Sequence, residues 1–329
     1  MPGATPRPQP DVFGTTEETV PIGANGGTAV GAKRGYPEAG TVQRVLVLVH
    51  SGKPLAVELA EQMRPFLEAQ VEEVRFETGV QAFADNSAKS RPDFRPDLLI
   101  VLGGDGAILH AVRSFGTHPV PTLGINFGAV GFLASTPATR WRETLDAVFA
   151  GQAVVEPRMR MSVRLRANSR KRAGLALNDV VVTRAPDQSM LRLGLYVGDD
   201  WVTDYRADGL ICSTPSGSTA YSLSAGGPIL APSMLGIVVT PIASQGLAAR
   251  PLVLHPDSRL RVRLLNDNVR ADVVIDGQLA GHLEVGRELG LQRHPRPYPL
   301  IALPGLDPYR RLRERLGWGG SVQPEGEPD

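Results

Sequence analysis

The hydrophobic pattern of this 329-residue chain changes near residue 150, and that change constrains the fold more than any other feature. Before it, short apolar runs of the kind buried on both faces of a parallel sheet alternate with a helical stretch. The strand-like runs are 44–49, 71–76, 97–102 and 122–125, and the helical stretch is 54–69. Thr136 and Pro137 predict the N-cap and first residue of a further helix, which ends at Gly151. Residues 41–150 are therefore predicted to form an open α/β domain with a mostly parallel sheet.

After Gly151, apolar residues recur at every second position. Met159, Met161, Val163 and Leu165 alternate with polar residues, the pattern of a strand with one face in a core and one in water. Similar runs follow at 174–184, 191–197, 252–265 and 271–276. Residues 151–316 are therefore predicted to form a β-rich, largely antiparallel domain with a glycine- and serine-rich insertion around 208–228.

Composition places the remaining segments and excludes several functions. Residues 1–40 and 317–329 are rich in glycine and proline without a hydrophobic period, so both are expected to be flexible tails. A net charge of +1 gives no global attraction to nucleic acid or an anionic membrane, and no apolar run is long enough to span one. The single cysteine, Cys212, forbids an intramolecular disulfide and suits a reducing cytosol. We therefore expect a cytoplasmic protein that binds neither nucleic acid nor a membrane.

Gly103-Gly104-Asp105-Gly106 lies between the strand 97–102 and a helical stretch that begins at Ala107. Glycines at such a junction expose backbone N–H groups and the positive end of the helix dipole to a phosphate. A carboxylate there repels phosphate unless it has a task of its own, such as binding a divalent cation or accepting a proton from a hydroxyl. The alternative is that Asp105 is an ordinary helix N-cap. Neither a dinucleotide-binding GxGxxG nor a P-loop occurs.

Three later segments are also candidates for a binding site. Residues 208–228 hold five serines, two threonines, a tyrosine and four glycines, which suits hydrogen bonding to sugar and phosphate oxygens; a polar surface loop is the alternative. Asn178-Asp179 interrupts an apolar run, as functional sites, bulges and hairpin turns all do. Asp276-Gly277-Gln278 is, by itself, a hairpin-turn signal. We expect Cys212 to be a small core residue.

Together the four segments resemble the motifs of the NAD kinase family, in the family's order. Gly103 to Gly106 resembles its GGDG motif, 177–180 its NE/D motif, 208–228 its long glycine- and serine-rich motif, and 276–278 its late acidic turn. The similarity extends over about residues 44–317. GGDG alone would also fit lipid kinases and phosphofructokinases. The family resemblance implies an active site between the two domains.

The resemblance also implies residue roles. Asp105 would be the general base for the 2′-hydroxyl of the adenosine ribose of NAD⁺, with phosphate held by Gly103, Gly104 and Gly106. Asn178 and Asp179 would contact the ribose and adenine region, and Asp208 the nicotinamide side. Further implied substrate-binding positions are Gly106, His110, Ser189, Arg206, Thr219, Ala220, Tyr221, Ser222, Leu223, Ser224, Asp276 and Gln278. The alternative for His110 is a solvated helix residue.

The implied activity is phosphorylation of NAD⁺ to NADP⁺ with ATP or polyphosphate as donor. Mg²⁺ is the implied divalent cation, with unidentified protein ligands, and a homo-oligomer, a dimer or tetramer, is the implied assembly. Two positions depart from the family: Asp179 replaces a frequent Glu, and Ala107 replaces a frequent Thr. A lipid kinase and a non-catalytic NAD(H)-sensing protein are the rival hypotheses. The hydroxyl-rich 208–228 segment argues against the first, and the retained Asp105 argues against the second.

Overall fold

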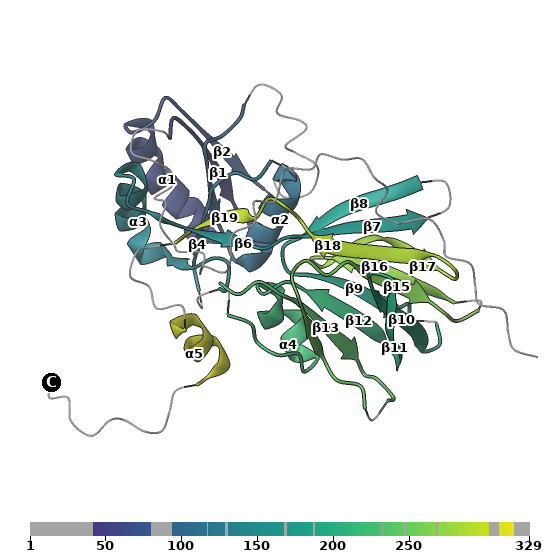
Figure 1. The fold of residues 1–329 in the computed structure, drawn as a ribbon. Coiled ribbons are helices and arrows are strands. Elements are labelled where there is room, and N and C mark those ends of the chain that lie inside the picture. The colour runs from purple at the N-terminus through teal and green to yellow at the C-terminus, as the bar shows by residue number, and fades with distance from the viewer. Residues whose placement is uncertain are drawn as a thin grey trace, which may run out of the picture. The chain divides into compact units, whose positions relative to one another are not determined.

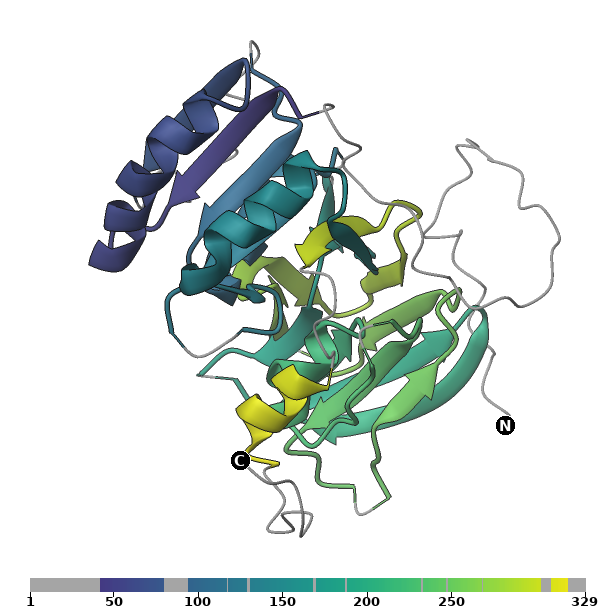
Figure 2. The same cartoon turned by 90° about the vertical axis from the view of Figure 1, so that its left-hand side faces the viewer.

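The structure, a computed structural model, divides the chain into two compact units, each of which is described by itself. It describes residues 42–79, 94–116, 118–128, 131–167, 170–186, 188–231, 233–246, 248–267, 269–302 and 309–318. The predicted tail 1–40, and all of the predicted tail 317–329 beyond Trp318, lie outside these residues. Figures 1 and 2 show the two units in views turned by 90°.

The first unit, which we call the α/β unit, is built on one mostly parallel sheet in the order β2-β1-β3-β4-β19-β6. Its strands are β1 (Arg44–Val49), β2 (Glu73–Thr78), β3 (Leu98–Leu102), β4 (Thr122–Asn126), β6 (Val154–Arg158) and β19 (Tyr298–Ala302), with the short β5 (Thr136–Pro137) beside β4. Only β6 runs antiparallel to its neighbour. Every residue of β3 and β4 is buried, as their uninterrupted apolar character predicts.

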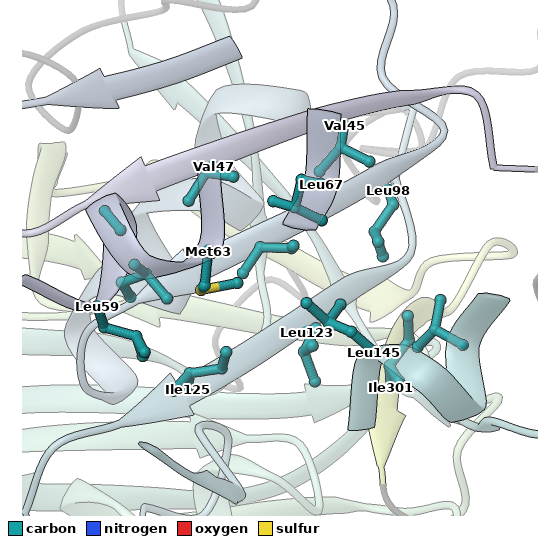
Figure 3. Packing of buried hydrophobic residues seen from close by; sticks show 14 of the residues in the cluster. Val45, Val47, Leu59, Met63, Leu67, Leu98, Leu123, Ile125, Leu145 and Ile301 are labelled. Atoms are coloured by element: carbon teal, nitrogen blue, oxygen red, sulfur yellow. The ribbon is translucent and has the colours of Figure 1, made fainter. Parts of the chain in front are cut away.

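Helices cover both faces of this sheet (Figure 1). Helix α1 (Pro54–Glu68) buries Leu59, Met63 and Leu67, spaced at four residues, against β1 and β3, and α3 (Trp141–Phe149) packs on the same face (Figure 3). Helix α2 (Asp105–Phe115) lies on the other face, where a Cβ added to Gly124 would meet Ile108 at 2.3 Å. Each buried leucine contributes about 1.5–3 kcal/mol.

Two features of this unit differ from the sequence prediction. Thr136 and Pro137 do not start a helix, because they form β5 beside β4; the 3-10 helix η2 (Ala138–Arg140) follows, and α3 begins at Trp141. The chain also does not divide once near residue 150. Strands β6 and β19 pair with each other and extend the parallel sheet. Residues 154–159, 295–302 and 309–318, the last of which include helix α5 (Arg310–Leu316), therefore belong to the α/β unit.

The second unit, which we call the β unit, is β-rich and antiparallel, as predicted, and consists of two six-stranded sheets. One has the order β11-β10-β15-β18-β7-β8, with β7 (Met161–Ala167), β8 (Arg170–Ala176), β10 (Leu191–Val197), β11 (Asp200–Ala207), β15 (Leu260–Leu264) and β18 (Glu288–Arg293). The other has the order β14-β13-β12-β9-β16-β17, with β9 (Asp179–Arg184), β12 (Gly209–Ser213), β13 (Ile237–Ile242), β14 (Leu252–Leu254), β16 (Arg270–Ile275) and β17 (Gln278–Glu284).

The 208–228 segment is only partly an insertion. Its first residues form β12, which lies fully buried between β9 and β13. The 3-10 helix η3 (Gly217–Thr219) and the short helix α4 (Tyr221–Ser224) follow. The run 174–184 is likewise two strands, because β8 and β9 belong to different sheets and the chain crosses between them at 177–178. Among the described residues, no helix is long and apolar enough to span a membrane.

Candidate functional site

The glycine-rich motif lies where the sequence predicts, between the carboxyl end of β3 and the N-terminus of α2. Gly104 is the N-cap and Asp105 the first helical residue. Gly106 is exposed, and a Cβ placed on it would have no atom of the chain within 4 Å. Free N–H groups at a helix N-terminus, next to open space, suit a phosphate. The position therefore fits the phosphate-binding loop implied by the family resemblance.

Asp105 is not the N-cap, and its half-buried carboxylate is bound by a loop that the sequence analysis missed. Its Oδ2 accepts a hydrogen bond from the N–H of Phe132 at 2.9 Å, and its Oδ1 accepts from Leu133 at 3.1 Å and Ala134 at 2.9 Å. A carboxylate has about four lone-pair directions, so one on Oδ2 is left to accept a further proton. Gly131 permits the close approach, since a Cβ there would lie 2.0 Å from Asp105 Oδ1.

His110 is half-buried in α2 rather than solvated. Burial, and secondarily the charge of Arg113, lowers the pKa of His110 to about 4. Its imidazole is therefore neutral at pH 7, with the Ser114 hydroxyl 3.4 Å from Nδ1. A neutral imidazole can donate or accept one hydrogen bond to a polar ligand but cannot neutralise a phosphate.

In the β unit, Asp276 holds the loop that carries Asn178 and Asp179. Its Oδ2 accepts from the N–H of Leu177 at 2.8 Å, and its Oδ1 accepts from Asn178 at 2.8 Å and Asp179 at 3.0 Å. Asp276 and Gly277, with φ of 45° and 78°, form the turn between β16 and β17, which confirms the predicted hairpin. Asn178-Asp179 itself is neither a bulge nor a hairpin turn. It lies where the chain passes from one sheet to the other, and Asp276, 97 positions after Asp179, holds it there.

The carboxyl group of Asp179 is buried at the start of β9, opposite Ser213 of β12. Burial, and secondarily the charge of Asp276, raises the pKa of Asp179 to about 7. The group is thus partly protonated at neutral pH and can donate or accept a hydrogen bond. Burial also raises the pKa of the neighbouring Cys212 to about 12, with a smaller effect from Asp179, so its thiol is unreactive, as expected of a small core residue.

The hydroxyl-rich segment packs directly against the same loop. Thr214 Oγ1 donates to the carbonyl of Leu177 at 2.5 Å, and a Cβ on Gly217 would lie 2.0 Å from the carbonyl oxygen of Asn178. Asn178 Oδ1 and Ser213 Oγ are buried without a hydrogen-bond partner among the described residues. Such a group costs about 1–3 kcal/mol unless a ligand or water satisfies it. The structure thereby brings the motifs at 177–180, 208–228 and 276–278 together around two polar atoms that can each form a further hydrogen bond.

The other proposed contact positions of this unit are distributed on both sides of β12. Residues after its carboxyl end, next to the Asn178 loop, include Ser222, whose hydroxyl is buried 2.8 Å from that of Thr240, and the half-exposed Tyr221. Asp208 lies at the opposite end and binds Arg184 Nε at 2.6 Å. Five residue steps along the chain separate Asp208 from Ser213, a distance of about 17 Å in a strand. The other positions of the segment that follow β12 are Thr219, Ala220, Leu223 and Ser224, and the exposed positions elsewhere in the unit are Ser189, Arg206 and Gln278.

The α/β unit carries a glycine-rich loop whose Asp105 carboxylate keeps one unused lone pair, and the β unit carries a polar loop at 177–179 that Asp276 holds in place. These are features of a nucleotide-dependent kinase. Comparison with family models identifies which one. Residues 45–153 match the ATP-NAD kinase N-terminal domain, and residues 177–303 match the ATP-NAD kinase C-terminal domain. The chain belongs to the NAD kinase family.

Individual relatives agree with this assignment. The NAD kinase of Rhodopirellula baltica is 38% identical over 70% of this chain and 74% of its own length. That of Heliobacterium modesticaldum is 36% identical over 83% of this chain and 98% of its own. Among solved structures, yeast NADH kinase complexed with NADH has a TM-score of 0.72 at 25% identity, covering 87% of this chain and 91% of its own. The Archaeoglobus fulgidus NAD kinase in complex with ATP, at 24% identity, covers 84% of this chain and 98% of its own with a TM-score of 0.65, and so shares the fold.

Proposed function

We propose that this protein transfers a phosphoryl group from ATP to the 2′-hydroxyl of the adenosine ribose of NAD⁺, producing NADP⁺ and ADP. The observation that carries the proposal is the open lone pair on Asp105 Oδ2 beside the glycine loop. The carboxylate takes the hydroxyl proton as the ribose oxygen bonds to the γ-phosphorus and the bond to the ADP oxygen breaks. The three N–H donors fix the orientation of the acceptor oxygen before substrate arrives.

The donor's phosphates would be held by the backbone N–H groups of Gly104 and Gly106. The N–H of Gly103, which the family resemblance also implies, already donates to the carbonyl of Ile125 at 3.0 Å. Among the described residues, no three His, Cys, Asp or Glu side chains gather into a metal site. Mg²⁺ usually binds through one or two carboxylates together with substrate phosphates, so the donor phosphates would supply most of its ligands. When bound, Mg²⁺ would neutralise charge on the donor phosphates.

For NAD⁺ binding, we assign the ribose and adenine contacts to Asn178 and Asp179. Their support is the unpartnered Asn178 Oδ1 and the protonatable carboxyl group of Asp179. Asp276 was expected to touch substrate, but its carboxylate already accepts three backbone N–H groups, which supports an anchoring role instead. The remaining contact residues proposed from the family resemblance are Gly106, His110, Ser189, Arg206, Asp208, Thr219, Ala220, Tyr221, Ser222, Leu223, Ser224 and Gln278.

We also propose a homo-oligomer, a dimer or tetramer, whose binding site includes residues of a neighbouring copy. Asp208 lies at the far end of β12 from Asn178 and Asp179, so a second copy is one way to bring the nicotinamide-side contact to the same ligand. Light scattering after gel filtration measures the assembly, and a monomer at working concentration would refute it. A cytoplasmic location is proposed from the single, buried, free Cys212.

One set of assays tests the activity. Purified protein with Mg²⁺ is incubated with NAD⁺ or NADH and with ATP or polyphosphate in all four pairings, and the product is measured with an NADP-specific dehydrogenase. We expect NADP⁺ from NAD⁺ and ATP. Labelled ATP with diacylglycerol tests the lipid-kinase rival. Absence of ATP-dependent loss of NAD⁺ would favour a non-catalytic sensor and refute the proposal.

A further inference from the structure

The C-terminal helix α5 contacts the loop that binds Asp105. Arg311, the second residue of α5, lies outside both ranges matched by the family models. It is 8% exposed, and its Nη1 donates a hydrogen bond to the carbonyl oxygen of Phe132 at 3.3 Å. Arg315 of the same helix places its guanidinium 6.0 Å from the centre of the Phe132 ring. Two side chains of α5 therefore meet one residue of the Asp105 loop.

A single peptide group joins Arg311 to Asp105. The carbonyl of Phe132 and the N–H of Leu133 belong to the same planar peptide and point in opposite directions. The carbonyl accepts from Arg311, and the N–H donates to Asp105 Oδ1 at 3.1 Å. A cation at the oxygen and a carboxylate at the N–H polarise this peptide in the same sense, so each hydrogen bond strengthens the other by about 10–30%.

The charges around Arg311 support this connection. Glu156 forms an ion pair with the buried Arg158, and its Oε2 lies 3.9 Å from Arg311 Nη1, so one carboxylate faces two guanidinium groups. Burial lowers the pKa of Arg311; the Glu156 and Asp105 carboxylates oppose that shift, and Arg158 adds to it. The Asp105 carboxylate therefore also acts on Arg311 electrostatically, in the direction that favours the charged guanidinium.

We propose that Arg311 is a positioning residue for the NAD kinase reaction: through the Phe132–Leu133 peptide it fixes the orientation of the Asp105 carboxylate. The inference rests on the proposed function, since it takes Asp105 as the proton acceptor. Arg311 does not itself touch the reacting atoms. It keeps the loop from relaxing, so that the open Oδ2 lone pair points in one direction while the other three lone pairs remain bound.

The test compares Arg311→Met, Arg311→Lys and the control Arg310→Met. Arg310 is exposed on the same helix and binds Glu314 one turn on, so its loss tests α5 stability without touching the loop. We expect Arg311→Met to lower kcat about 10–100-fold while KM for NAD⁺ and ATP stays within about twofold. Arg311→Lys, which keeps the charge, should recover to within about fivefold of wild type. Arg310→Met should match wild type.

Hydrogen exchange supplies a readout independent of activity. The Leu133 amide should exchange faster in Arg311→Met and at the wild-type rate in Arg310→Met. The proposal is overturned if kcat of Arg311→Met stays within twofold of wild type, if Arg311→Lys loses as much as Arg311→Met, or if Leu133 exchange is unchanged. A wild-type enzyme that makes no NADP⁺ would instead refute the proposed function, and the exchange measurement would still test the contact.

Discussion

Replacing Asp105 by Asn tests two roles of this residue at once, as proton acceptor and as anchor of the 131–134 loop. Asn has one carbonyl oxygen and an NH₂ group where Asp has two acceptor oxygens. If the Asn oxygen keeps the bonds from Leu133 and Ala134, its NH₂ faces the N–H of Phe132, donor against donor. The substitution therefore perturbs structure as well as chemistry.

The size of the structural effect follows from the three bonds. A hydrogen bond to a charged group contributes about 1.5–3 kcal/mol, and a neutral one about 0.5–1.5 kcal/mol. Asp105→Asn loses one charged bond and converts two to neutral bonds, which destabilises the loop by about 3.5–6 kcal/mol. We expect a lower unfolding midpoint by calorimetry, faster exchange of the 132–134 amides, and no measurable NADP⁺ formation.

A matched control separates the two roles. Asp97 lies at the opposite end of β3 and binds backbone in the same way: its Oδ2 accepts from the N–H of Gln43 at 3.2 Å and of Arg44 at 2.9 Å. Asp97→Asn should destabilise the same unit by a similar mechanism and leave kcat unchanged. Loss of activity in both variants would attribute the effect to stability alone.

Two results would refute the reasoning about Asp105. An unfolding midpoint and amide exchange equal to wild type would show that its carboxylate does not bind the loop. NADP⁺ formation near the wild-type rate would show that it is not the proton acceptor. Either result stands without the other, because the first is measured without substrate.

Three further substitutions test other residues. The pKa of Asp179 is raised from 3.8 to about 7, so this group's contribution to stability is fully present below about pH 4 and is lost as pH rises through 7. Between pH 5 and pH 8 the loss is about 3 kcal/mol, and Asp179→Asn should remove this difference between the free energies of unfolding measured at the two pH values. Asp276→Asn should raise KM for NAD⁺ at least tenfold while changing KM for ATP less, in steady-state kinetics, because it frees the 177–179 loop. Gly106→Ala should leave the unfolding midpoint equal or higher and raise KM for ATP, because the added methyl meets no atom of the chain and occupies only ligand space. An unchanged KM for ATP would remove Gly106 from the phosphate site.

The sequence predicts the local parts of this structure and not the long-range ones. The apolar strand β3 and the glycines after it are local signals, and both lie where expected. The anchors are not local: Asp105 binds residues 27–29 positions later, and Arg311 binds Phe132 across 179 positions. No periodicity links such partners. Strand β19 was missed as part of the parallel sheet for the same reason, because its neighbours β4 and β6 lie far back in the chain.

Two motif carboxylates, Asp105 and Asp276, solve the same structural problem in their separate units. Each accepts the N–H groups of three consecutive residues, 132–134 or 177–179, and so fixes a loop that regular structure leaves without partners. They differ in access to solvent: Asp276 is 6% exposed, whereas Asp105 is half-buried at a helix N-terminus. A fully buried carboxylate can only hold the loop in place, whereas a carboxylate with an accessible lone pair can also accept a proton from a ligand. An acidic residue in such a motif is therefore first an anchor, and its exposure decides whether it also does chemistry.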